Sequence, residues 1–283
     1  MPPVVIPNPI LNSPYREPTR HFRFDADDQI TSHIDAGRRR SCYFLPIAAP
    51  KKRGAPSLLD DLPQQKEEST HVNRIRRLVK AWRDLGWPDV THVTRSLLEY
   101  WTGDDRFRRL FFCQVEALET LVFVTEVAKQ SKYGQDWIET YLRERATDAG
   151  TDLFRVACKM ATGSGKTVVM SMLIAWQVLN KRRSPHDPRF TDAFLVVAPG
   201  ITIRDRLRVL LPSDPNNYYR ELDVVPPEYR ADLGTAKIVV TNFHAFKLRE
   251  REDGRDVHAR RLAGAEQAPQ PAGQPVHRRL PRR

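Results

Sequence analysis

The stretch KMATGSGKTVVM, residues 159–170, constrains the fold more than any other part of the sequence. Its centre, GSGKT, matches the end of the phosphate-binding pattern G-x-x-x-x-G-K-[ST], although Met160 stands at the first glycine position. Glycines let the backbone approach a phosphate closely, and the N–H groups at the start of the following helix face its negative charge. Because such a loop joins a strand to a helix, the pattern predicts an α/β domain.

The sequence around this loop alternates between short apolar runs and longer helical patterns. We predict strands at residues 153–158, 194–198 and 237–241. We predict helices at residues 165–180 and 201–211, and a further helix beginning at Phe243. Strands that alternate with helices form a parallel sheet covered on both faces.

The chain divides into four regions by composition. Residues 1–70 are rich in proline and charge, which predicts an irregular region with an edge strand at SCYFLPI. Residues 71–149 are helical, residues 150–250 hold the partial nucleotide-binding domain, and residues 251–283 form a disordered basic tail. In the helical region we predict helices at residues 71–85, 91–101, 104–129 and 136–146.

Charge and cysteine content limit the classes of partner and compartment. The net charge of +11 fits a polyanionic partner, but solvated loops explain it equally well. The tail alone contributes +4, from eight arginines minus four acids. Three distant cysteines form no disulfide framework and no zinc pattern, which predicts a cytoplasmic protein. We expect no signal peptide and no membrane span.

Four stretches together resemble one helicase family. MATGSGKT resembles motif I of superfamily 2 helicases, and FFCQVEAL resembles their upstream glutamine motif. FLVVAPGITIRDRL resembles motif Ia, and KIVVTNFHAF resembles motif Ib. Their order is similar to that in the DEAD/DEAH-box helicase subunits of type III restriction enzymes, over residues 6–250. The resemblance implies a truncated RecA-like P-loop domain with a parallel sheet, preceded by an irregular and helical N-terminal region.

The resemblance also implies roles for individual residues. Gln114 would read adenine, Lys166 would be catalytic by reaching the β and γ phosphates of ATP, and Thr167 would hold Mg²⁺. The implied ATP-binding residues are Gln114, Thr162, Gly163, Ser164, Gly165, Lys166 and Thr167. The implied DNA-binding residues are Gly200, Arg204, Thr241 and Asn242. Two alternatives stay open: Gln114 is a helix-surface side chain, and Thr241 with Asn242 is a plain helix N-cap. The implied partners are DNA, through backbone contacts, and a modification methyltransferase subunit.

The sequence after the loop lacks other parts of such a motor. No Asp-Glu pair of motif II follows the loop, and no second motor domain supplies an arginine finger, which is worth roughly 10³ to 10⁵ in rate. We therefore expect an ATP- and DNA-binding helicase part with negligible turnover. The alternatives are a non-hydrolysing module that binds DNA or a partner, and an unrelated P-loop enzyme such as a kinase.

The abrupt change of composition near residues 249–254 suggests a truncated or frameshifted reading frame as a hypothesis. Resequencing past the codon for Glu250 tests it. An intact frame, with no helicase motifs in the other two frames, contradicts the hypothesis.

Overall fold

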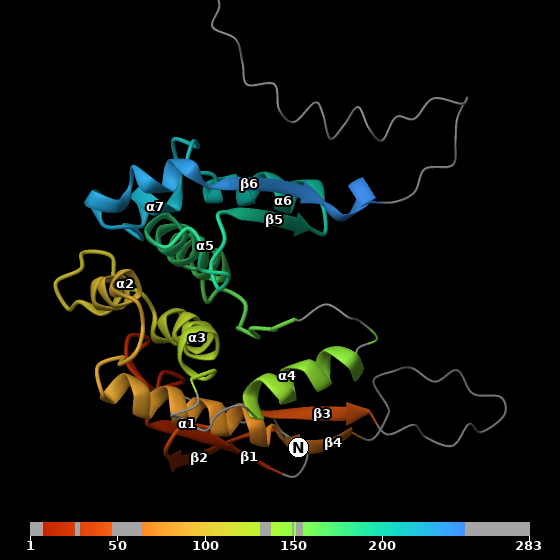
Figure 1. Ribbon diagram of the computed structural model, residues 1–283. Helices are drawn as coiled ribbons and strands as arrows, with labels where there is room; N and C mark the ends of the chain where they lie inside the picture. The colour runs from red at the N-terminus through yellow and green to blue at the C-terminus, as the bar shows by residue number, and fades with distance from the viewer. Residues whose placement is uncertain are drawn as a thin grey trace, which may run out of the picture. The chain divides into compact units, whose positions relative to one another are not determined.

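The computed structural model describes residues 8–25, 29–46, 64–130, 137–148, 150 and 155–246 (Figure 1). One unit runs to Asn242, and a second begins at Phe243. In the second unit the structure describes the short 3₁₀ helix Phe243–Phe246, where we predict the start of a helix. The predicted tail, residues 251–283, lies outside the described residues.

The N-terminal region contains two antiparallel strand pairs. Its strands are β1 (Arg20–Phe24), β2 (Ile30–Ala36), β3 (Cys42–Pro46) and β4 (Gln64–Glu68). β1 pairs with β2, and β3 pairs with β4. Across the first pair, the Arg23 guanidinium donates to both carboxylate oxygens of Asp35. The predicted edge strand is confirmed as β3, whereas the expectation of an irregular region is wrong for these residues, because cross-strand contacts stabilise the pairs.

The helices supply most of the core. They are α1 (Thr70–Asp84), α2 (His92–Thr102), α3 (Phe112–Val122), α4 (Trp137–Asp148) and α5 (Lys166–Arg183). Val79, Leu97, Leu118 and Trp176, from four of these helices, are buried in one apolar cluster. In the described part of the chain, every helix is too short or too polar to cross a membrane.

The segment before α3 differs from the prediction. We predict one helix from residue 104 to residue 129, but α3 begins at Phe112. Arg106 is buried and donates to the backbone carbonyl oxygens of Tyr100, at 3.2 Å, and Asp223, at 2.7 Å. The second contact ties the loop to a residue 117 positions away along the chain. The helix therefore starts later because the Arg106 side chain fixes the loop to distant carbonyl oxygens, which local periodicity does not reveal.

A buried carboxylate joins three elements of the core. α3 continues as one π-helical turn, Phe123–Val127, which carries Glu126. Glu126 accepts hydrogen bonds from the Thr94 hydroxyl (2.6 Å), the Trp176 indole N–H (2.8 Å) and the Thr91 backbone N–H (3.0 Å). Asn180 donates from its amide to the Thr94 hydroxyl, at 3.0 Å. This network fixes α5 against α2 and the π turn, and the donors satisfy the buried charge.

The parallel strand pair that we predict from the apolar runs is present. β5 (Ala193–Ala198) pairs with β6 (Lys237–Asn242), in register from the first residue to the last (Figure 1). The helix predicted after β5 is shorter, because α6 (Ile201–Arg206) gives way to a 3₁₀ turn, Leu207–Leu210. The remaining short helices are α7 (Tyr218–Glu221) and the 3₁₀ turns Pro227–Tyr229 and Asp232–Thr235.

The strand predicted at residues 153–158 is wrong for its described residues. Residues 155–160 belong to no strand, and residues 153–154 lie outside the described part of the chain. A strand needs a neighbour to receive its backbone hydrogen bonds. No described residue makes a backbone hydrogen bond to residues 155–160, so the segment enters the glycine-rich loop without a sheet around it.

Replacing Glu126 with alanine should lower the free energy of unfolding by about 3 kcal/mol, because three buried donors lose their acceptor. Urea denaturation measures the change. Glu139→Ala is the control, since Glu139 forms an exposed pair with Arg143 that is worth under about 1 kcal/mol. Equal losses in the two variants would contradict a central role for the Glu126 network.

Candidate nucleotide-binding site

The glycine-rich loop has the backbone of a phosphate-binding turn. Gly163 and Gly165 both have φ of +79°, in the left-handed region where a side chain costs about 1–2 kcal/mol. No described atom lies within 4 Å of the position that a Cβ would take at Gly163. The loop is therefore open on that side, and glycine is needed there for its backbone rather than for space.

One carbonyl oxygen holds the turn together. The Ala161 carbonyl accepts hydrogen bonds from the Ser164 hydroxyl (2.7 Å), the Ser164 backbone N–H (3.4 Å) and the Lys166 ammonium (2.8 Å). Lys166 is exposed, so its ammonium lies over the loop while it keeps solvent contact. A ligand with negative oxygens at the loop mouth would meet this charge directly.

Four backbone N–H groups of the loop and the first helical turn have no acceptor among the described residues. α5 is 18 residues long, and Gly165 is its N-cap. The first backbone hydrogen bonds of the helix run from the Val168 and Val169 N–H groups to the Gly165 carbonyl. No described residue accepts from the backbone N–H of Gly163, Gly165, Lys166 or Thr167. Unpaired N–H groups at a helix N-terminus are suited to bind an anion.

Thr167 offers a hydroxyl as a ligand for a cation at this site. Thr167 is half-buried in the first turn of α5, directly after Lys166. The described residues contain no cluster of three or more histidine, cysteine, aspartate or glutamate side chains able to hold a metal ion. The residues present fit Mg²⁺ only as an ion that a bound phosphate chain would bring.

Gln114 lies against the loop. Its Oε1 accepts from the Phe111 backbone N–H at 2.9 Å, and its Nε2 donates to the Ser164 carbonyl oxygen at 3.1 Å. Gln114 is only 5% exposed, so it is not a helix-surface side chain. A Cβ at Gly165 would approach Gln114 Nε2 to 2.1 Å. The structure thus places the Gln114 amide against the loop backbone, a contact that the sequence does not reveal.

The predicted DNA-binding residues meet at the carboxyl ends of two strands. Thr241 and Asn242 lie beside Val197 and Ala198 in the parallel register, and Gly200 precedes α6. Gly200 is the N-cap of α6 and has an extended backbone. Arg204 lies on α6, and its guanidinium contacts the neighbouring Asp205 carboxylate at 2.7 Å. The structure therefore groups these residues but pairs the arginine with an acid.

A large cavity adjoins the entry to the loop. It has a volume of about 730 Å³, and residues 155–161 and Ser164 form one wall, with parts of α1, α3 and α4 opposite. Cys113 and Cys158 also line it. Surrounding protein atoms disfavour the thiolate form and raise the pKa of both thiols. The two cysteines are therefore poor nucleophiles near neutral pH.

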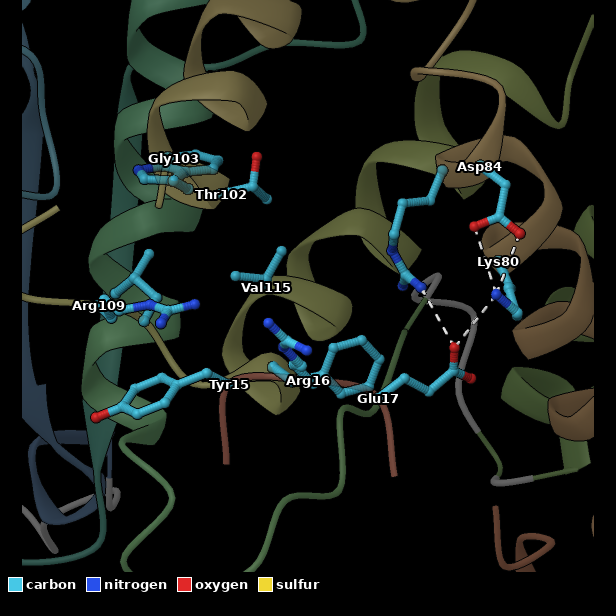
Figure 2. A pocket seen from close by; sticks show the side chains of 13 residues that line it. Tyr15, Arg16, Glu17, Lys80, Asp84, Thr102, Gly103, Arg109 and Val115 are labelled. Atoms are coloured by element: carbon cyan, nitrogen blue, oxygen red, sulfur yellow. Dashed lines mark hydrogen bonds and ion pairs between the residues drawn. The ribbon is translucent and has the colours of Figure 1, made fainter. Parts of the chain in front are cut away.

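A second pocket of about 290 Å³ lies on another side of α3 (Figure 2). Lys80 contacts Asp84 at 3.1 Å and Glu17 at 3.5 Å, as Figure 2 shows, and Glu17 also lies 4.0 Å from Arg83. The acids neutralise the lysine and arginine of α1 on this wall. Neither Gln114 nor the glycine-rich loop lines this pocket, so it is separate from the candidate nucleotide-binding site.

Comparison with known families identifies the chain. A family model described as "Type III restriction enzyme, res subunit" matches residues 110–264, more than half of the sequence. The chain belongs to this family. The family implies a helicase-like, RecA-like P-loop fold, to which the described residues contribute α5 and the parallel pair β5–β6. Neither a curated protein nor a solved structure matches the chain.

Gly165→Ala should destabilise the chain more than Gly163→Ala. Both substitutions place a side chain at φ +79°, at about 1–2 kcal/mol, but only the Cβ at position 165 collides with Gln114. The collision should add about 1 kcal/mol or more, measured by urea denaturation.

Combining Gly165→Ala with Gln114→Ala should remove the added part, which a double-mutant cycle detects as coupling. If the two glycine variants lose the same stability and no coupling is found, Gln114 does not press against Gly165.

Proposed function

We propose that this chain is the ATP-binding part of a helicase-like motor of the restriction-enzyme type, and that residues 162–167 hold the phosphate chain. The observation that carries the proposal is that the N–H groups of residues 163, 165, 166 and 167 have no acceptor among the described residues, in a turn that contains two glycines with positive φ. Lys166 would exchange the Ala161 carbonyl for the β and γ phosphates. Thr167 would contribute its hydroxyl to Mg²⁺, which stabilises charge on the phosphates.

DNA would bind along the carboxyl ends of β5 and β6. Gly200, Thr241 and Asn242 would contact the sugar-phosphate backbone through loop amides and polar side chains. Arg204 can add a cationic contact only if a phosphate competes with Asp205 for its guanidinium. A modification methyltransferase subunit as a further partner follows from the family resemblance alone.

We also propose that the chain of 283 residues binds ATP without appreciable hydrolysis. No Asp-Glu pair follows the P-loop in this sequence, so no carboxylate of that kind orients an attacking water. Glu252 and Asp253 stand in a charged stretch outside the described residues. Lys166 and the loop N–H groups would then serve binding, and turnover would need groups that this sequence does not contain.

Lys166→Ala should abolish measurable ATP binding, because the lysine supplies the charge at the loop mouth. Calorimetry with Mg-ATP measures the affinity, and circular dichroism checks that the helical content is unchanged. Lys181→Ala is the matched control, since Lys181 lies at the far end of the same helix and contacts the Asp187 carbonyl. Unchanged affinity in Lys166→Ala would refute the assignment of the site.

The same samples test turnover. We expect phosphate release from ATP to stay at background with and without single-stranded DNA. Clear DNA-stimulated release that disappears in Lys166→Ala would overturn the proposal of binding without hydrolysis.

Asp205→Asn should raise the affinity for single-stranded DNA, and Arg204→Ala should lower it, each by roughly twofold to fivefold. The reason is that Asp205 neutralises Arg204, and an exposed pair is worth about 0.2–1 kcal/mol. Fluorescence anisotropy at several salt concentrations measures both effects, with a log–log slope of about −0.7 per neutralised phosphate. A salt-independent affinity, or changes of equal sign in the two variants, would exclude backbone binding by Arg204.

A further inference from the structure

The Gln114 amide contacts the backbone of the loop itself. We propose that Gln114 is a positioning residue, which fixes the Ser164–Gly165 peptide so that the Gly165 N–H faces the phosphate chain. This inference rests on the proposed nucleotide site. It differs from the role that the family resemblance implies, in which Gln114 reads adenine.

Both ends of the amide have defined partners. The Phe111 N–H is a donor, so the atom facing it must be Oε1, and the Ser164 carbonyl is an acceptor, so the atom facing it must be Nε2. Rotating the amide by 180° would place like groups against each other at both ends. The first contact caps α3, and the second reaches the loop, so the side chain links the start of α3 to the start of α5.

The geometry of the peptide bond means that this contact also sets the direction of the Gly165 N–H group. All described peptides are trans, and in a trans peptide the C=O and the N–H point in opposite directions. Because the Ser164 C=O points toward Gln114 on α3, the Gly165 N–H of the same peptide points away from α3. No described residue accepts a hydrogen bond from it. Gln114 thus holds one loop donor in the direction where a phosphate oxygen would lie.

The fit between Gln114 and the loop is tight. Gln114 is 5% exposed, and of the two loop glycines only Gly165 would bring an added Cβ against this side chain, at 2.1 Å from Nε2. Gly165 therefore has two reasons to be glycine, its positive φ and the space that Gln114 occupies. A side chain buried in this way has little freedom to rotate toward a base.

The two roles predict different ligand dependence. If Gln114 positions the loop, its replacement weakens every ligand that carries the phosphate chain, whichever base is attached. If Gln114 reads adenine, its replacement weakens ATP and leaves ligands without adenine unchanged. Mg-ATP, Mg-GTP and inorganic triphosphate with Mg²⁺ separate these outcomes.

The test uses two variants of the full chain, Gln114→Glu and Gln114→Ala. Gln114→Glu keeps the acceptor for Phe111 but turns an oxygen toward the Ser164 carbonyl. We expect each variant to lower the affinity for all three ligands by the same factor, roughly threefold to tenfold, the range for one lost hydrogen bond. Gln130→Glu is the matched control, because the Gln130 amide also donates to backbone carbonyls, those of Asp89 and Glu126, away from the loop.

Hydrogen exchange of the loop amides at residues 162–165 gives a readout that needs no ligand. Faster exchange there in both Gln114 variants, with unchanged exchange inside α1 and in the Gln130→Glu control, supports the positioning role. A loss of affinity confined to ATP, or unchanged exchange in the loop, overturns it. If the unaltered chain binds none of the three ligands, the proposed nucleotide site fails, and the exchange rates alone decide whether Gln114 holds the loop.

Discussion

The hydrogen bond between Gln114 and the Ser164 carbonyl is the contact on which the candidate site depends. The segment that enters the loop, residues 155–160, has no backbone hydrogen bonds to described residues. A loop that lacks a sheet on its entry side must be held from another direction. α3 provides that support, because its first turn caps itself through Gln114 and reaches the loop with the other end of the same amide.

The Glu126 network supports the same helix at a different place. It joins the π turn after α3 to Thr94 on α2 and to Trp176 on α5. α5 is thus held to the α3 segment near its N-terminus by Gln114 and along its length by Glu126. The buried Glu126 carboxylate is stable there because it accepts three hydrogen bonds, from the Thr91 N–H, the Thr94 hydroxyl and the Trp176 indole N–H. The loop is therefore carried by a helix with little freedom to shift.

Charge distribution explains why the net charge of +11 was not decisive. In the described residues several arginines are neutralised by acids, such as Arg38 with Glu116 and Arg83 with the buried Glu119. Arg204 is also paired, with Asp205. The exposed pair of Arg204 and Asp205 is weak, whereas the pair of Arg83 and Glu119 is shielded from solvent and serves the fold.

The sequence by itself determined the family, through the resemblance of its motifs. It also determined the glycine-rich turn, the helices α1, α2, α4 and α5, and the parallel pair β5–β6, because these follow from local spacing of glycines and apolar side chains. Only the tertiary structure decided where α3 begins, because Arg106 satisfies distant carbonyls, and whether residues 155–160 form a strand, because a strand needs a neighbour. It also decided what Gln114 contacts. A side-chain amide has donors and an acceptor in any fold, and only the folded chain brings the Phe111 N–H and the Ser164 carbonyl to its two ends.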